Sequence, residues 1–488
     1  MTRPNILFVI LDATRADACS CYGAKQPTTP NLDALAAEGT LYEQAISPAP
    51  WTLPAIASLF TGLFPHQIGI YERRQLTPSV PTLAFLLSQH GYRTFGISGN
   101  GWMSADFGLQ RGFDHFHKLW QLVQVAQDIN ELVVLDQAPT KRRTLGLLHR
   151  WRQGSLLKNI VNTAYNSLWA YHRDYGASRT LRPLLRWIKA QPSPWFAFVH
   201  YLEPHLEFRP PRPWARRFAA DWERARRLMR QDQMRLAWRH MTGVERLTQE
   251  DLKTWRDLYL AEVAYTDWHL GLLVEALARE GYLSQTAVIV SADHGESLGE
   301  HGLLNHQYGV YDTLLRVPLI IRYPARFPVR ERVSRQVQTL DLFSTILEIA
   351  EVEAPPSSGK SLRVDSEDAH PFVVAEYGIP RLPPAAHLRR FGLQPSDLQP
   401  FARGFVALRS DPYKLIVGTD GSVTLYNWRQ DPGEEHDLAA EQPTVVQGLQ
   451  HTLQHWQAEM GKISMGGEEL GEMDPTAAAR LRALGYIE

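Results

Sequence analysis

One short segment of the chain places side chains with acid, base and metal-binding chemistry next to each other. Asp293 and His294 stand side by side at the end of an apolar run, and Gly295 follows them. A carboxylate and an imidazole in this position can both turn toward one cation, and a glycine lets the backbone bend around it. A histidine that only caps a loop gives the same pattern. The segment therefore indicates either a cation site or a structural turn.

Two distant positions could complete such a site. Asp12 ends the first apolar run of the chain, and Thr52 precedes a helical pattern that runs to Gly62. At a helix N-terminus a hydroxyl meets free backbone NH groups and the positive end of the helix dipole, which suits an anionic ester group. Thr52 also fits a simple N-cap, with Pro54 tolerated in the first turn. The sequence is compatible with both roles.

Asn100, Arg15 and His301 are further candidates for the same site. Asn100 follows a strand pattern and could donate to a charged oxygen, and a turn-forming asparagine is the competing interpretation. Arg15 lies about one helical turn beyond Asp12, where it would touch the site or form a salt bridge. His301, together with Glu300, is expected to support the loop that carries Asp293 and His294.

These side chains need elements that bring them together. Short apolar runs rich in β-branched and aromatic residues predict strands, and helical patterns at 31–39 and 82–90 lie between them. The predicted strands are Asn5–Leu11, Arg93–Ser98, Trp195–Tyr201, Thr286–Ser291 and 317–322. The alternation predicts an α/β fold with a mostly parallel sheet flanked by helices. Because such sheets place their sites at the carboxyl ends of strands, we expect the candidate residues at one edge.

The pattern changes beyond about residue 370. Short strands at 405–408, 414–417 and 423–426, separated by turns, predict a small antiparallel sheet, and a helix at 445–460 is expected to pack on it. We therefore expect a main α/β domain over 1–370 and a smaller C-terminal α+β subdomain over 371–488. Amphipathic helical character with little strand signal marks 117–190 as a helical insertion in the main domain.

Composition restricts the class of partner. The 488 residues are 44% hydrophobic and carry a net charge of -1, so no global field indicates nucleic acid or an anionic membrane. No stretch approaches the roughly 18 uninterrupted apolar residues of a membrane helix, and the first apolar run ends too early for a secretory signal. Cys19 and Cys21 are too close for a disulfide and suit a reducing setting. We expect a cytoplasmic protein without membrane insertion, either a monomer or a homo-oligomer.

The order of short motifs along the chain resembles the sulfatase branch of the alkaline phosphatase superfamily. The matching segments, from the N-terminus onward, are 4–12, 21–23, 29–33, 59–62, 111–114, 200–205, 293–302, 316–320, 341–342 and 413–416. They span nearly the whole chain, and their combination is specific. The resemblance implies an alkaline-phosphatase-like fold and a hydrolase that uses a divalent metal ion to cleave small anionic esters.

The chain departs from this family at the nucleophile. Family members carry a cysteine or serine in a C-x-P-x-R signature, which is matured to formylglycine. Aligned on the downstream Leu-x-Thr-Gly, this sequence has Thr52 at the nucleophile, Pro54 at the proline and Ile56 at the arginine. Threonine has no thiol to oxidise. Phosphodiesterase and phosphoethanolamine-transferase relatives use a threonine that a metal activates directly, so the departure favours phosphorus over sulfur.

The resemblance also implies the ligands of the ion. Asp12, Thr52, Asp293 and His294 would hold it. Ala13 stands where many sulfatases have a further metal-binding aspartate. Losing that carboxylate makes the site less suited to calcium, which takes about six to eight oxygens, and favours zinc or manganese. Calcium and magnesium remain alternatives.

Two histidines are implied as partners of the reacting group. His205 matches a family histidine that contacts the sulfuryl or phosphoryl oxygens. His306 lies near a basic family position that assists there or protonates the leaving group, so both could be general acids. The spacing of Glu203, His205 and His306 also allows a second metal ion, which is an alternative to one ion.

Together these inferences predict a metal-dependent hydrolase that cleaves or transfers a phosphoester or phosphonoester through a covalent Thr52 intermediate. One alternative is a sulfuric ester hydrolase without formylglycine. The other is a binding or scaffold homologue without catalysis. A scaffold has no need for a buried cluster of ionisable residues, because such a cluster costs desolvation energy.

Overall fold

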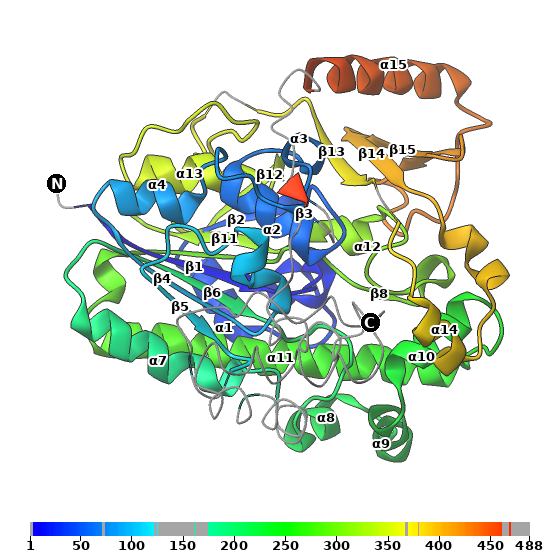
Figure 1. The fold of residues 1–488 in the computed structure, drawn as a ribbon, viewed down its shortest axis with the longest axis horizontal. Coiled ribbons are helices and arrows are strands. Elements are labelled where there is room, and N and C mark those ends of the chain that lie inside the picture. The colour runs from blue at the N-terminus through cyan, green and yellow to red at the C-terminus, as the bar shows by residue number, and fades with distance from the viewer. Residues whose placement is uncertain are drawn as a thin grey trace, which may run out of the picture.

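The computed structural model describes residues 3–70, 74–121, 124, 162, 174–366, 369–378, 380–460 and 468–469. Its centre is a nine-stranded sheet with helices on both faces, and a separate four-stranded sheet lies beside it (Figure 1). The predicted α/β fold with a C-terminal antiparallel sheet is confirmed.

The large sheet has the spatial order β10-β2-β11-β7-β1-β6-β4-β5, and β12 pairs with β2 at its side. Its strands are β1 (Asn5–Leu11), β2 (Thr40–Ile46), β4 (Arg93–Ser98), β5 (His115–Lys118), β6 (Trp195–Tyr201), β7 (Thr286–Ser291), β10 (Arg316–Val317), β11 (Leu319–Arg322) and β12 (Glu331–Gln338). Strands β7, β1, β6, β4 and β5 run parallel. The predicted strand at 317–322 is divided by Pro318 into two strands that pair antiparallel with β2, because proline has no NH to donate.

Alternate residues of β1 face two different layers, which is why every residue after Asn5 in this strand is apolar. Ile6, Phe8 and Ile10 pack with α2 (Thr52–Thr61), α4 (Leu83–Gln89) and α13 (Asp341–Ile349). Leu7, Val9 and Leu11 pack with α1 (Pro30–Ala37), α7 (Ala177–Ala190) and the long α11 (Gln249–Arg279). In Figure 1 the first group lies above the sheet, and α7 and α11 lie below it. Because both faces of β1 are buried, the strand is fixed in position, and so is its end, where the site lies.

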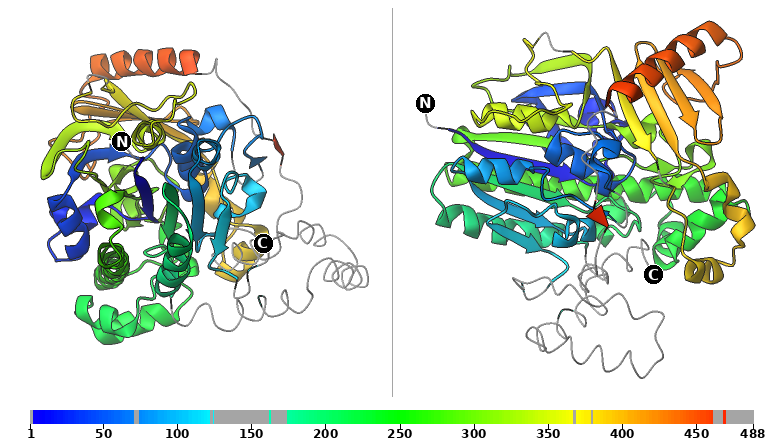
Figure 2. Two further views of the ribbon diagram at one scale, coloured as in Figure 1. Left: turned by 90° about the vertical axis from the view of Figure 1, so that its left-hand side faces the viewer. Right: turned by 45° about the horizontal axis from the view of Figure 1, so that its top comes forward.

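The four-stranded sheet is antiparallel and follows the order β13-β14-β15-β16. These strands are β13 (Phe372–Tyr377), β14 (Phe405–Ser410), β15 (Tyr413–Gly418) and β16 (Val423–Asn427). Helix α15 (Pro443–Met460) lies along this sheet (Figure 2) and buries Leu453 and Trp456 against it. The predicted subdomain with one helix on a small sheet has this arrangement.

A buried ionic cluster joins the two sheets. Lys414 of β15 is fully buried, and its Nζ lies 2.7 Å from Asp312 Oδ1 and 2.7 Å from Glu434 Oε1. The Arg409 guanidinium binds the other oxygen of Asp312 at 3.1 Å. Asp312 begins α12 (Asp312–Leu315), which leads into β10 of the large sheet. Because a buried charge without a partner is costly, this cluster fixes the subdomain to the main domain.

Three further helices, α8 (Arg212–Phe218), α9 (Trp222–Arg230) and α10 (Gln233–Met241), pack beside α11. The predicted helical insertion at 117–190 lies largely outside the described residues. At its described ends, β5 pairs with β4, and α7 packs on the main sheet. Within the described ranges, no helix combines the length and apolar character that crossing a bilayer requires.

Candidate active site

The two central carboxylates of the site come from adjacent strand ends. Asp12 directly follows β1, and Asp293 lies two residues beyond β7. Strand β1 pairs in parallel with both β7 and β6, so the three strands end at the same edge. The backbone NH groups of Ala13 and His294 donate to Asp293 Oδ1 at 3.2 and 2.9 Å. This leaves Asp293 Oδ2 directed toward the site.

Thr52 brings a hydroxyl to the same site from a helix rather than from a strand end. It is the first residue of α2, and Trp51 occupies the N-cap position with extended backbone. The Thr52 hydroxyl faces the site and lies 3.2 Å from His294 Nε2. The structure therefore brings Asp12, Thr52, Asp293 and His294 together. That these four residues hold the ion stays a prediction.

Asn100 lies between the nucleophile position and the first carboxylate. Its Nδ2 donates to Asp12 Oδ2 at 2.9 Å and to Thr52 Oγ1 at 3.4 Å. Its Oδ1 accepts from the NH of Trp102 at 3.0 Å, which holds the amide in this orientation. Asn100 thus has both roles considered from the sequence, because it caps a short turn and also donates into the site.

His200 is a site residue that the sequence reasoning missed. It lies in β6 and is 1% exposed. Its Nε2 is 3.2 Å from Asp12 Oδ2, and its Nδ1 is 3.0 Å from the hydroxyl of Ser98. The available signal was a lone histidine inside the otherwise apolar run Trp195–Tyr201, at a strand end that was already expected to carry the site.

The donor atoms of this cluster fit a divalent cation. One ligand atom each from Asp12, His200 and Asp293 lies within 4.8 Å of the others. Among the described residues, Asp12 Oδ1 and Asp293 Oδ2 are buried and find no hydrogen-bond partner, and His200 Nε2 lies 3.2 Å from Asp12 Oδ2. Leaving carboxylate oxygens buried and unpaired is expensive, and a cation held by these oxygen and nitrogen donors removes that cost.

The pKa values of Asp12 and Asp293 are shifted in opposite directions. Burial raises the pKa of Asp12, but the hydrogen bond to His200 and the charges of His205, His200 and His294 outweigh burial and lower it. Burial and the charge of Asp12 raise the pKa of Asp293 above its ordinary value. Two carboxylates in one buried site repel each other unless positive charge lies between them. A divalent ion held between them would supply that charge.

His205 and His306 lie next to the cluster. Their ring centres are 4.7 Å apart, and the His306 ring centre is 4.5 Å from that of His294. His306 Nδ1 lies 3.5 Å from Glu296 Oε2, another fully buried group. Burial, followed by the charges of His294 and His205, lowers the pKa of His306 well below its ordinary value. The imidazole of His306 is therefore neutral near pH 7.

Glu203 does not join these histidines. Its carboxylate accepts from the NH of Ala177 at 3.3 Å. Burial and the charge of Asp174 raise the pKa of Glu203 to about 7. The donor atoms of Glu203, His205 and His306 do not gather within 4.8 Å of one another, so the structure does not form the second ion site considered from the sequence.

Arg15 and His301 lie outside the reacting centre. Arg15 binds Asp17 and Glu300 at 2.7 and 2.8 Å, so it forms the salt bridges considered for it rather than contacting Thr52. The His301 ring stacks on Tyr311 with 3.7 Å between ring centres. Both residues support the loop that follows Asp293.

A guanidinium from the C-terminal part of the chain reaches the site, which no sequence motif indicated. Arg381 is 8% exposed. It lies over the rings of Trp51 and Trp102, at 4.8 and 4.9 Å from their centres. Its charge is one of those that lower the pKa of His306. Arg381 is therefore positioned next to the residue that precedes Thr52.

Comparison with known proteins identifies the family of the chain. The Sulfatase family model matches residues 4–352. The chain is 26% identical to the uncharacterized sulfatase YidJ of Escherichia coli K12, over 90% of this chain and 83% of that protein. It is 25% identical to arylsulfatase K of Bos taurus, over 92% of this chain and 81% of that protein.

Solved structures share the fold. The phosphonate monoester hydrolase of Agrobacterium radiobacter superposes with a TM-score of 0.68 at 22% identity, covering 94% of this chain and 96% of its own. The phosphonate monoester hydrolase SpPMH of Silicibacter pomeroyi gives 0.63 at 20% identity, covering 97% and 96%. Because the family model spans most of the chain and the site residues lie at the expected strand ends, the chain belongs to the sulfatase family and is an ester-hydrolysing enzyme.

Proposed function

We propose that this enzyme hydrolyses phosphoesters or phosphonoesters through a covalent intermediate on Thr52. The observation that carries the proposal is the position of the Thr52 hydroxyl, 3.2 Å from His294 Nε2 and 3.4 Å from Asn100 Nδ2. The residue is 1% exposed and begins a ten-residue helix. A buried hydroxyl that faces an imidazole at the positive end of a helix dipole is placed as an activated nucleophile would be.

Asp12, Thr52, Asp293 and His294 would hold a divalent ion, and His200 supplies a further donor beside Asp12. When bound, the ion lowers the pKa of the threonine hydroxyl and offsets the negative charge of the ester. The mixed oxygen and nitrogen donors favour zinc or manganese. The amide nitrogen of Asn100 contacts both the Thr52 hydroxyl and Asp12, and so fixes their relative position.

The reaction needs one nucleophile and a path for protons. Thr52 Oγ1 attacks the phosphorus while the bond from phosphorus to the leaving oxygen breaks. His205 and His306 are the candidates for carrying the threonine proton to the leaving oxygen, and His306 starts neutral because burial lowers its pKa. Water then attacks the phosphorus of phosphothreonine and restores the hydroxyl.

The choice of phosphorus over sulfur depends on the threonine. In a hydrated formylglycine, one hydroxyl carries the sulfate, and the second loses its proton, re-forms the aldehyde and expels the sulfate by cleavage of the C–O bond. A threonine has one oxygen and must release its ester by attack of water. A sulfate monoester of Thr52 would be hard to release in this way. Two of the solved structures with this fold are phosphonate monoester hydrolases, which agrees with the proposal.

A substrate panel with two matched variants tests the proposal. The metal-loaded enzyme is assayed on aryl phosphate, phosphodiester, phosphonate monoester and sulfate substrates. We expect turnover of one or more phosphorus esters, loss of that turnover in Thr52→Ala, and partial retention in Thr52→Ser, which keeps a hydroxyl. Mass spectrometry after rapid quenching should locate the phosphoryl group on Thr52. Turnover of sulfate esters alone, or full activity of Thr52→Ala, would overturn the proposal.

A further inference from the structure

Helices α8 and α9 carry a concentration of positive charge outside the candidate active site. The whole chain is balanced, with 51 basic and 52 acidic residues. The segment 209–230, which spans both helices, contains eight arginines and only two acidic residues. In Figure 1 the two helices lie below α11, at the lower edge of the molecule. A strong local charge of one sign therefore lies on two projecting helices and indicates an anionic partner.

Nearby carboxylates neutralise arginines of α9 but not those of α8. Both acidic residues of the segment, together with Asp251 of α11, form ion pairs with arginines of α9. Arg212, Arg216 and Arg217 of α8 are exposed, and among the described residues no carboxylate pairs with them. Their guanidiniums are therefore available to an anion outside the molecule, because no internal ion pair has to be broken first.

Tryptophan side chains lie among these arginines. The guanidiniums of Arg212 and Arg216 lie over the ring of Trp222, at 5.7 and 4.9 Å from its centre. Trp214 of α8 contacts Trp268 of α11 with 5.9 Å between ring centres. Trp268 is 44% exposed, although burial of so large an apolar ring would be favourable. This part of the molecule thus combines positive charge with aromatic rings.

We propose that it docks on a bilayer that contains acidic phospholipids. The docking residues, which we call the α8 surface, are Arg212, Arg216, Arg217, Trp222 and Trp268. Arginine side chains bind acidic headgroups, and tryptophan favours the headgroup layer because its ring is apolar and its NH is polar. The contact lies on the surface of the bilayer, since no helix in the described part of the chain has the length and apolar character of a membrane span.

A flexible polyanion such as single-stranded nucleic acid fits the α8 surface less well. Proteins bind such chains in a groove and stack the bases on free aromatic faces. Here guanidiniums lie over the ring of Trp222, and Trp268 packs against Tyr265 and His269 with 6.2 and 4.7 Å between ring centres. A headgroup layer surrounds a projecting side chain and needs no free ring face. The arrangement of the rings therefore favours a bilayer.

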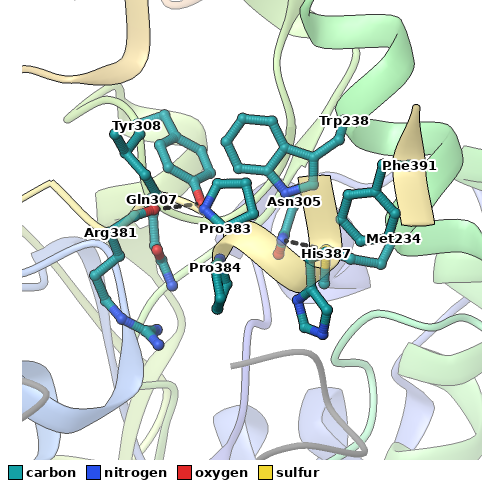
Figure 3. Close-up of a pocket in the computed structure, with 11 residues that line it drawn as sticks. Met234, Trp238, Asn305, Gln307, Tyr308, Arg381, Pro383, Pro384, His387 and Phe391 are labelled. Atoms are coloured by element: carbon teal, nitrogen blue, oxygen red, sulfur yellow. Dashed lines mark hydrogen bonds between the residues drawn. The ribbon is translucent and has the colours of Figure 1, made fainter. Parts of the chain in front are cut away.

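The α8 surface is separate from the place where the reaction occurs. Helix α8 packs on α11, and no side chain assigned to the candidate active site belongs to α8 or α9. The small pocket drawn in Figure 3 is lined by α10, by the loop at 305–308 and by a segment that ends in α14 (Ala385–Phe391). Changes on the α8 surface should therefore leave turnover of a soluble ester unchanged, and docking is tested without turnover.

Cosedimentation with vesicles tests the inference. The metal-loaded protein is mixed with vesicles of phosphatidylcholine alone, and with vesicles of phosphatidylcholine and phosphatidylglycerol. We expect binding only to the acidic vesicles, and we expect it to weaken as the salt concentration rises. In a variant that combines Arg212→Gln, Arg216→Gln and Arg217→Gln, the partition coefficient should fall by roughly 100-fold, because three arginines near the bilayer are lost.

A matched control removes the same charge from other parts of the surface. Arg93→Gln, Arg330→Gln and Arg429→Gln together replace three exposed arginines outside α8 and α9, and this variant should bind the acidic vesicles like wild type. Trp268→Gln keeps every charge of the α8 surface, so it should weaken binding without changing the salt dependence. The melting temperature of each variant should equal that of wild type, which excludes loss of the fold as the cause.

Two results would overturn the inference directly. One is equal binding of wild type and the α8 arginine variant to the acidic vesicles, and the other is equal binding of wild type to neutral and acidic vesicles. Tight binding to a soluble polyanion such as heparin, without binding to vesicles, would also overturn it and assign the α8 surface to a polymer. Vesicle binding in an enzyme without phosphoester turnover would instead refute the proposed function alone.

Discussion

The amide nitrogen of Asn100 donates to Asp12 at 2.9 Å and reaches the Thr52 hydroxyl at 3.4 Å. Asn100 follows β4 and Asp12 follows β1, two strands that are separated by β6. A single side chain therefore links a proposed metal ligand to the proposed nucleophile across the edge of the sheet.

Replacing this amide should slow catalysis more than it weakens the fold. Asn100→Asp keeps an oxygen that can accept from the NH of Trp102, but it removes the donor and adds a negative charge beside Asp12. We expect kcat to fall by about 100-fold or more, in line with the loss of one donor from a reacting centre. Steady-state kinetics and metal analysis check this. Activity within about twofold of wild type would show that the amide does not act on the reaction.

His200 should contribute to metal affinity. His200→Ala removes the imidazole that lies 3.2 Å from Asp12 Oδ2, and we expect metal affinity to fall by about 10- to 100-fold. Titration of the metal-free protein with zinc or manganese measures the change. Ser98→Ala, which removes the hydroxyl that contacts His200 Nδ1 and accepts from the Asn100 NH at 3.0 Å, should have a smaller effect on metal affinity. Equal affinities in wild type and His200→Ala would exclude this role.

Removal of the metal should lower stability as well as activity. Without a cation, Asp12 and Asp293 are left as two buried carboxylates with unpaired oxygens. An ion present at about 100 times its dissociation constant stabilises the folded state by about 2.7 kcal/mol. We therefore expect chelation to lower the melting temperature and abolish turnover, with recovery on adding zinc or manganese. A melting temperature that does not respond to metal would contradict the assignment.

The buried cluster between the two sheets predicts a large mutational effect. Lys414→Met leaves Asp312 and Glu434 without their shared cation, and we expect a loss of about 3–5 kcal/mol in the free energy of unfolding. The exposed pair of Arg429 and Asp411 is the control, because Arg429→Met should cost about 1 kcal/mol or less. Urea unfolding of both variants measures the difference. Similar losses in the two variants would show that burial of the ion pair adds little to the cost of removing its cation.

The same cluster gives a pH dependence. Burial raises the pKa of Asp312, but the charges of Arg409 and Lys414 outweigh burial and hold it below its ordinary value of 3.8. A carboxyl with a lowered folded-state pKa stabilises the protein above its unfolded pKa and loses that contribution as the pH falls through its folded pKa. Asp312→Asn should therefore lower the urea midpoint at pH 7 more than at pH 3. An equal change at both pH values would contradict this linkage.

The sequence predicted the strands with continuous apolar runs and missed those with polar residues. Strands β1, β4, β6 and β7 have the expected bounds, because burial on both faces requires apolar residues throughout. Strand β12 (Glu331–Gln338) is partly exposed and carries several polar side chains, so its sequence pattern does not indicate a strand. It is held in the sheet by its pairing with β2. Helix α11 was missed because it is buried on several sides and its buried positions include polar residues such as Glu262 and Asp267, so its sequence does not show one apolar face.

The site was predictable where residues follow strand ends and unpredictable where side chains arrive from elsewhere. Asp12, Asp293 and His294 belong to local patterns that sequence shows directly. His200 sits inside a strand, and only the register with β1 reveals that it faces Asp12. Arg381 reaches Trp51 through the packing of the C-terminal part on the main domain, and no periodicity encodes that contact.

The order of strands in the large sheet has a consequence for synthesis. Strand β1 leaves the ribosome before its partners in the sheet, β6 and β7, which follow at 195–201 and 286–291. A strand that is apolar on both faces must therefore wait without its neighbours while much of the chain is translated, and contacts so distant in sequence form slowly. Production of the enzyme should for this reason depend on chaperones and improve when translation is slowed by growth at low temperature.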